Sequence, residues 1–361
     1  MDKILKAVFL VLTVIYLVSL TFDGVLIRQV ITVLFFVISL FTIAVKKSRF
    51  SAGTIVGIFF FVLLLAFTAF ISPNDDWKLK VFFIFSGVAF LVYSYSLYVL
   101  DYKNYFLHFL FVACAIIIAR LIVIHDENLI FFHASRNIVA TFVLFPVICC
   151  FLFTERNKVL LPLALLTVFM CFLLKGRTAL LLSFVIMCVA LYRVFGLKIL
   201  IIIVLLSSPL LFYINFDGLN ESLAAHTNFS EGLKTTRSVI YDEYFSNFSL
   251  TDFVLGRSFD GMVIINILNN NPHNSFLLIH SLFGFLPAIL LLIMFITSAL
   301  AIFMRNGVIA ALLFTLIPIK AMTDSVIFFN ILDVFYMLPL MFLLTRKKAD
   351  FNAVSQVTDY K

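Results

Sequence analysis

Runs of about 17–25 apolar residues recur along almost the whole chain, and this recurrence restricts the fold more than any other feature of the sequence. A run of this length, wound as an α-helix, crosses the ~30 Å hydrocarbon core of a bilayer. In that core every backbone N–H and C=O group needs a partner within the protein, which a helix supplies. Hydrophobic residues make up 63% of the chain and charged residues only 12%, which excludes a soluble globular domain. We therefore predict an all-α polytopic integral membrane protein.

We expect about twelve transmembrane helices, which together form one domain over residues 1–345. The first apolar run follows Lys3 and Lys6 as in a signal peptide, but no small-residue cleavage site comes after it, so we expect it to be retained. The predicted spans are 5–22, 27–45, 52–71, 80–100, 105–124, 138–153, 159–174, 178–195, 198–214, 276–303, 307–322 and 326–344.

The charged residues between these spans predict the orientation of the protein. The side that receives both termini has ten more basic than acidic residues, and the other side has three more acidic than basic residues, which together give the net charge of +7. The positive-inside rule assigns the first side to the cytoplasm. Both termini, with the tail 346–361, are then cytoplasmic, and the large loop 215–273 is external. The excess of basic residues therefore reflects the orientation of the protein in the membrane and does not indicate nucleic-acid binding.

The large external loop and its end contain the most unusual polar residues. Residues 236–248 favour a helix with one broad apolar face, which we expect to lie along the membrane surface or to cap the bundle; a simple surface helix is the alternative. After Pro272, we expect His273 and Asn274 to occupy the first turn of a helix, where free N–H groups attract anions. His280 shares that face. A lone histidine on an apolar helix is more often structural, so both readings stay open.

Several arginines lie on the external side, where the positive-inside rule disfavours them. Arg177 stands in a very short turn between two spans, Arg136 precedes Asn137 at the head of another, and Arg237 and Arg257 lie in the loop. A guanidinium group makes bidentate hydrogen bonds to phosphate oxygens and never loses its charge. Several of them at one membrane face would hold a pyrophosphate whose lipid tail remains in the bilayer.

Two carboxylates at or inside the last predicted spans require partners. Asp324 is expected near the external surface and Asp333 deeper, and a buried carboxylate without a partner is costly, so each should face a cavity or meet an arginine. Arg120, late in the fifth span, is the obvious partner within the bundle. Alternatively, the external arginines merely pair with carboxylates such as Asp324, Asp126 or Glu127.

Four landmarks in this order resemble those of a known family. His273–Asn274 is followed after nine residues by Gly284, and Pro287 stands three positions later. This is similar to the signature of the bacterial O-antigen polymerase and O-antigen ligase superfamily: a His, a small polar residue, nine positions and Gly-x-x-Gly, with Pro287 replacing the last glycine. Three other elements of that family are similar to Arg177–Thr178 at the start of a span, Thr236–Arg237–Ser238 in the loop, and Thr323–Asp324–Ser325. The resemblance is strongest over residues 160–345 and rests on topology alone before them.

The resemblance implies a membrane-embedded glycosyltransferase of the bacterial inner membrane that needs no metal or other cofactor. Its donor would be a sugar chain on undecaprenyl pyrophosphate, and a chain-length regulator protein is a candidate partner. Arg177 and Arg237 would clamp the donor pyrophosphate and stabilise its departing charge, while His273 would act as general base on the acceptor hydroxyl or orient the acceptor. Residues expected to contribute to substrate binding are Arg136, Asn137, Asn274, Arg257, His280 and Asp324. The five cysteines lie inside apolar runs without metal-ligand spacing.

Two activities compete within this family. A polymerase transfers the growing chain to the next lipid-linked repeat unit, whereas a ligase transfers the finished chain to lipid A–core. We favour the polymerase because the chain is compact and its loop small; capsular and exopolysaccharide polymerases would look the same. The alternative from another class is a transporter such as a lipid-linked oligosaccharide flippase, but no internal repeat is visible and the polar residues gather at one face. A structural scaffold is a weaker alternative, disfavoured by the external arginines.

Overall fold

The computed structural model describes residues 1–345 of the chain, apart from 49, 75, 133, 155–156, 214–235 and 269. Within these residues the protein is helical, and the only β-type pairing is an isolated bridge between Phe131 and Ala134. The predicted cytoplasmic tail 346–361 and the first part of the predicted external loop, 215–235, lie outside the described residues.

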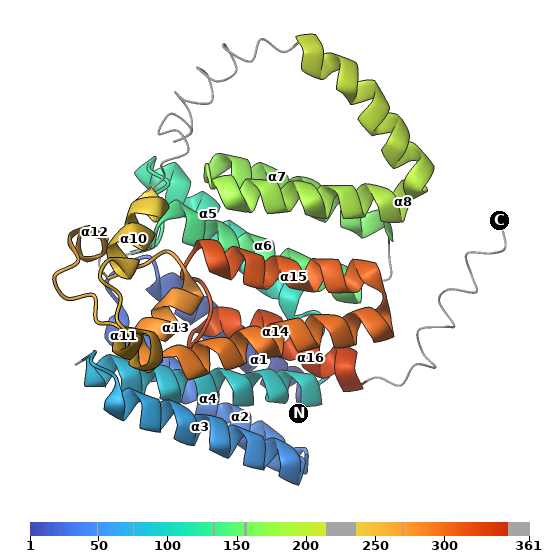
Figure 1. Cartoon of the computed structure of the whole chain (residues 1–361). Helices are drawn as coiled ribbons and strands as arrows, with labels where there is room; N and C mark the ends of the chain where they lie inside the picture. Colours follow the sequence, from blue (N-terminus) through green and yellow to red (C-terminus); the bar gives the residue numbers. More distant parts are fainter. Residues whose placement is uncertain are drawn as a thin grey trace.

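The first half of the chain forms a series of long apolar helices (Figure 1). They are α1 (Asp2–Ser19), α2 (Val25–Val45), α3 (Ala52–Ile71), α4 (Trp77–Val99), α5 (Tyr105–Ile124), α6 (Arg136–Phe153), α7 (Asn157–Leu173) and α8 (Arg177–Tyr213). Gly196, with φ 77°, kinks α8 between the two spans predicted there.

The second half contains shorter helices, and α10 to α12 gather at one end of the bundle (Figure 1). The elements are α10 (Thr236–Phe245), α11 (Leu250–Leu255), α12 (Val263–Ile267), α13 (Ser275–Phe283), α14 (Phe285–Asn306), α15 (Val308–Thr323), the 3₁₀ turn η2 (Ile331–Asp333) and α16 (Val334–Thr345). In the described part of the chain six helices are long and apolar enough to cross a membrane: α2, α4, α5, α6, α14 and the Arg177–Leu197 part of α8. This is the architecture of a multi-pass α-helical membrane protein.

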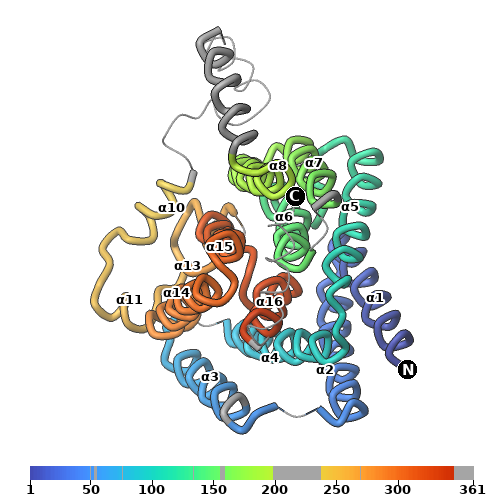
Figure 2. The backbone as a smooth tube through the Cα atoms, turned by 90° about the vertical axis from the view of Figure 1, so that its right-hand side faces the viewer, coloured from blue at the N-terminus to red at the C-terminus, as the bar shows by residue number. Residues whose placement is uncertain are grey.

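The helix α6 is the centre of the bundle because its apolar residues surround its whole circumference. Every residue from Val139 to Leu152 is buried. α5, α7, α8, α15 and α16 all pack against it (Figure 2). The first turn of α6, with Arg136 and Asn137, is thereby fixed at the end of the bundle where α8 begins and α15 ends.

Two of the predicted spans differ from the structure. The span predicted at 276–303 is broken at Gly284 (φ 77°) into α13 and α14. At this point two backbones approach so closely that a Cβ on Gly284 would lie 2.4 Å from the Val254 carbonyl oxygen, and a Cβ on Gly256 would lie 2.2 Å from that of His280. Glycine is required at both positions, since it has no Cβ and tolerates positive φ.

The last predicted span, 326–344, begins too early. Residues 324–330 form no helix, and the chain becomes helical only at η2 and α16. Ser275 Oγ accepts a hydrogen bond from the Val326 amide (2.9 Å), and the Asp333 carboxylate accepts one from the Phe328 amide (2.7 Å). These side chains satisfy backbone groups that a helix would otherwise pair, so the apolar composition of 326–330 does not produce a helical turn.

Candidate functional site

The site is built around Asp324, which ends α15 and is completely buried. Lys320 lies one turn earlier on the same helix and is also completely buried, with its Nζ in an ion pair with Asp324 Oδ2. Residues four apart share one face of a helix, so α15 itself brings these two charges together. Two ions without solvent contact stabilise each other only as a pair.

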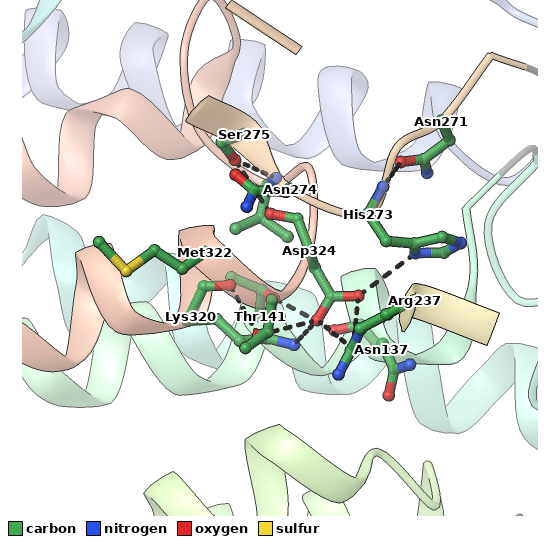
Figure 3. Close-up of polar contacts among 12 residues, drawn as sticks. Asn137, Thr141, Arg237, Asn271, His273, Asn274, Ser275, Lys320, Met322 and Asp324 are labelled. Atoms are coloured by element: carbon green, nitrogen blue, oxygen red, sulfur yellow. Dashed lines mark hydrogen bonds and ion pairs between the residues drawn. The ribbon is translucent and has the colours of Figure 1, made fainter. Parts of the chain in front are cut away.

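Arg237 and His273 approach the same carboxylate from two other elements (Figure 3). Arg237, in the first turn of α10, places its Nη2 3.4 Å from Oδ2 and 3.5 Å from Oδ1 of Asp324. His273, just before α13, places its Nδ1 3.6 Å from Oδ1. Two of the three residues predicted to be catalytic therefore meet, and the predicted binding residue Asp324 is their common partner.

Burial divides this group into an inner and an outer part. The Arg237 side chain is 30% exposed and that of His273 is 16% exposed, whereas Lys320 and Asp324 have no exposure. Burial on its own would raise the pKa of Asp324, but the charge of Lys320, the hydrogen bond from His273 and the charge of Arg237 together hold that pKa below its usual value. The Asp324 carboxylate thus contacts two cationic side chains, those of Lys320 and Arg237. Of these two, Arg237 is the one whose positive charge is exposed.

The start of α13 differs from the prediction. Asn274 is the N-cap, its Oδ1 accepting from the Phe276 amide (2.9 Å) and the Leu277 amide (3.1 Å), so the helix begins at Ser275. His273 precedes the helix with φ 50°. Because Asn274 already satisfies two amides of the first turn, these amides are not available to an anion as expected. The predicted binding residue Asn274 also donates from Nδ2 to the Tyr241 hydroxyl at 3.0 Å.

Ser275 fixes the backbone beside the charged group. It is completely buried, and its Oγ donates to the Asp324 carbonyl oxygen at 3.0 Å while accepting from the Val326 amide. This joins the start of α13 to the end of α15, which keeps His273 close to Asp324. Sequence reasoning did not single out Ser275 or Lys320; the spacing of Lys320 and Asp324 by one helical turn was the available sign.

A second cluster of charged side chains is centred on Glu127, in the loop between α5 and α6. Its Oε1 is 2.9 Å from Arg136 Nη1 and 3.0 Å from Lys175 Nζ. Burial would raise the pKa of Glu127, but a hydrogen bond from its own backbone, with Lys175 and Arg136, holds it below the usual value. Arg136 therefore pairs with Glu127, one of the carboxylates that the alternative interpretation of the arginines named.

Arg177 begins α8 at the same end of the bundle. The preceding Gly176 packs against α6 so closely that a Cβ there would lie 3.4 Å from Asn137 Oδ1 and from Ala140 Cβ. In Figure 3 Asn137 and Thr141 lie on the α6 side of the Asp324 group. The predicted residues Arg136, Asn137 and Arg177 thus lie at the starts of α6 and α8, two helices that pack against each other and against α15.

His280 and Arg257, expected to bind substrate, instead hold α10 and α11 onto α13. His280 Nδ1 is 2.7 Å from the Tyr244 hydroxyl and its Nε2 is 2.9 Å from the Phe253 carbonyl oxygen. Arg257 Nη1 donates to the carbonyl oxygens of Tyr244 and Ser246, both at 2.6 Å. With both ring nitrogens occupied, His280 has the structural role that is usual for a lone histidine on an apolar helix.

Arg120 also has a different role from the expected one. It donates to the carbonyl oxygens of Thr21 (3.1 Å) and Ile130 (3.4 Å) and thus ties the end of α5 to neighbouring loops. Asp324 is paired with Lys320 instead, and Asp333 accepts from the Phe328 and Asn330 amides at 2.7 and 3.0 Å.

Among the described residues, no group of three or more His, Cys, Asp or Glu side chains is placed to hold a metal ion. Two cavities of about 500 and 150 Å³ lie among the described residues, both partly open to the outside, and neither is lined by Arg177, Arg237 or His273. Comparison of the chain with known protein families, with curated proteins and with solved structures found no match.

Proposed function

We propose that the protein is a glycosyltransferase of the bacterial inner membrane that polymerises a surface polysaccharide, as O-antigen polymerases do. Its donor is a growing glycan on undecaprenyl pyrophosphate, and its acceptor is the next lipid-linked repeat unit. The observation that carries this proposal is the meeting of Arg237 and His273 on the buried Lys320–Asp324 pair. A partly exposed guanidinium group beside an imidazole combines a phosphate ligand with a proton acceptor.

The proposed topology extends that of the six long helices. The shorter apolar helices α3, α7, α15 and α16 also cross the bilayer, as do α1 and the second part of α8, which gives the twelve crossings expected from the sequence. Both termini are cytoplasmic, and α10 to α12 with the Asp324 group face the periplasm. The distribution of basic residues supports this orientation.

In the proposed reaction the acceptor hydroxyl oxygen attacks the anomeric carbon of the donor glycan. A new glycosidic C–O bond forms while the bond from that carbon to the pyrophosphate oxygen breaks, and the electron pair leaves with the lipid pyrophosphate. His273 takes the proton of the hydroxyl. Because its Nδ1 faces Asp324, Nε2 is the nitrogen that accepts the proton, and Asp324 stabilises the imidazolium that results.

Arg237 is suited to bind the leaving pyrophosphate. Its distances of 3.4 and 3.5 Å to Asp324 are long for a charged hydrogen bond, and its side chain is partly exposed, so a diphosphate can compete for it. When Arg237 turns to the donor, Lys320 still neutralises Asp324. Arg177, at the start of α8, is proposed as the second guanidinium group for the same diphosphate.

The test is a transfer assay with purified protein and synthetic undecaprenyl-pyrophosphate-linked repeat units. We expect Arg237→Ala and His273→Ala each to lower the rate of chain extension by at least about 10²-fold. Arg120→Lys, a change in an external arginine that binds carbonyl oxygens, should retain the rate. Extension at the wild-type rate in both Arg237→Ala and His273→Ala would refute the proposal.

Deletion of the gene in the producing bacterium separates the competing activities. Lipopolysaccharide with a single repeat unit indicates the polymerase, whereas polymer that stays on the lipid carrier indicates a ligase. Repeat units that fail to reach the periplasm indicate a transporter.

A further inference from the structure

The larger cavity, of about 500 Å³, lies between α3, α4, α14 and α16 and is partly open to the outside of the bundle; none of the charged residues around Asp324 lines it. Its walls are hydrocarbon, with Phe61 and Leu65 from α3, Leu91 from α4, Met294 from α14, and Met337 and Leu340 from α16. Methionine side chains are flexible and polarisable, so a wall that contains them adapts to an irregular apolar guest.

The carboxylate in the cavity wall is already satisfied by the protein. Asp333 accepts hydrogen bonds from the amides of Phe328 (2.7 Å) and Asn330 (3.0 Å), and Tyr336 is hydrogen-bonded to it as well. A guest in this cavity is therefore offered apolar contact, and a polar guest would lose its hydrogen bonds to water without replacement. The expected guest is a hydrocarbon.

The position of α3 makes lipid hydrocarbon available to this cavity. The face of α3 opposite the cavity is strongly exposed, with Phe59 at 59%, Phe60 at 65% and Leu63 at 48%, as expected for a helix that faces lipid. Figure 2 shows α3 at the periphery of the bundle. A cavity of about 500 Å³ is several times larger than the roughly 150 Å³ apolar cavities that stay empty in soluble proteins.

The segment 324–330 connects the cavity with the charged group. It begins at Asp324, and near its end Phe328 and Phe329 line the cavity. Both phenylalanines have φ 72°, a conformation that is rare for bulky residues and persists only where the surroundings hold it. Seven extended residues span at most about 25 Å, so a long lipid chain with its headgroup at Arg237 can reach the cavity.

We propose that this cavity binds the hydrocarbon chain of the polyprenyl diphosphate carrier while its diphosphate lies at Arg237. This inference rests on the proposed function for the identity of the lipid. The cavity holds the part of the chain nearest the headgroup, and Phe328 and Phe329 form the wall between cavity and charged group.

Gly57 provides a direct test because it lies in the α3 wall, and a Cβ placed there meets nothing within 4 Å. The side chain in Gly57→Phe extends into the cavity, whereas Gly57→Ala adds one methyl group and is the matched control. Met294→Trp fills the same space from α14. Similar thermal unfolding of all three variants shows that none has lost its fold.

The probe is geranylgeranyl diphosphate with a photoreactive diazirine on its chain, added to purified protein in phosphatidylcholine nanodiscs. We expect labelled peptides from α3, α14 and α16 in the wild type and in Gly57→Ala, and loss of this labelling in both Gly57→Phe and Met294→Trp. Labelling of these peptides that is unchanged in both filled variants overturns the proposal.

A second probe distinguishes the carrier from ordinary lipid. If phosphatidylcholine with a diazirine in its acyl chain labels the same peptides and an excess of unlabelled geranylgeranyl diphosphate does not compete, the cavity is a bilayer-lipid site and the proposal is wrong. Failure of the proposed function gives a different result: Gly57-dependent, competable labelling persists while the transfer assay is negative.

Discussion

Removing one member of the Lys320–Asp324 pair should destabilise the protein far more than removing both. Breaking a buried ion pair from one side costs about 3–5 kcal/mol, because the remaining charge is left without water or partner. We expect Lys320→Met to lower the free energy of unfolding by about 3 kcal/mol, since Asp324 keeps Arg237 at 3.4 Å and His273 at 3.6 Å. We expect Asp324→Asn to lower it by about 5 kcal/mol, because Lys320 is completely buried and loses its counter-charge.

The double variant Lys320→Met/Asp324→Asn removes both charges and should be close to the wild type in stability, within about 1–2 kcal/mol. The assay is thermal unfolding of the purified protein in detergent at one fixed scan rate, with the melting temperatures compared in order. The control pair is Lys46–Asp2, whose side chains are 27% and 48% exposed and whose removal should change stability by about 1 kcal/mol or less. Effects of Lys320→Met and Asp324→Asn that simply add in the double variant would refute this reasoning.

Four further predictions concern the residues around this pair. Arg237→Ala should lower the rate of glycan transfer by about 10²–10³-fold, and Arg237→Lys should restore only part of it, because an ammonium group cannot make the bidentate contact; equal rates for Lys and Arg would contradict this. His273→Ala should lower the same rate by about 10²–10⁴-fold, and a rate within about tenfold of the wild type would argue against a general base. Since the pKa of Asp324 is lowered in the folded protein, its contribution to stability is present above the usual aspartate pKa of about 4 and is lost as pH falls through the lowered value. The melting temperature should therefore drop in that acid range, and Asp324→Asn should remove this part of the drop. His280→Ala should loosen the contacts among α10, α11 and α13, at a cost of about 1–3 kcal/mol, and increase proteolysis there while the transfer rate of intact protein changes little; a selective loss of transfer would restore its predicted binding role.

The long helices could be predicted from the sequence because their cause is local. The ranges expected at 27–45, 52–71 and 105–124 agree with α2, α3 and α5 to within two residues, since the length of an apolar run sets the length of the helix. The break at Gly284 could not be read in the same way. Its cause is the approach of the Gly256 and Gly284 backbones, a contact between segments far apart in the chain.

The site shows the same division between local and tertiary causes. The prediction singled out Arg237, His273 and Asp324 by residue type and position, and the structure brings them together; their roles in catalysis remain predictions. Lys320 was counted as part of an apolar run, although its spacing from Asp324 placed both on one face of α15. His280 received a binding role because no pattern in the sequence reveals Tyr244, 36 residues earlier, as its partner.

A buried carboxylate on its own would be unsuited to a site proposed for a diphosphate, because it repels the ligand. The distances within the group resolve this conflict. Lys320 contacts Asp324 closely and without solvent, so the pair as a whole is nearly neutral to an approaching anion, whereas Arg237 and His273 lie at 3.4–3.6 Å and keep some exposure. Asp324 therefore orients these two side chains in the absence of substrate, and under the proposed function it would give up only its contact with Arg237, which is longer than that with Lys320, when a diphosphate binds. A lysine at position 320 is needed for the proposed exchange. Without it the departure of Arg237 would leave Asp324 with His273 and the Thr323 hydroxyl, and binding the donor would carry the cost of a buried charge that lacks a permanent counter-charge.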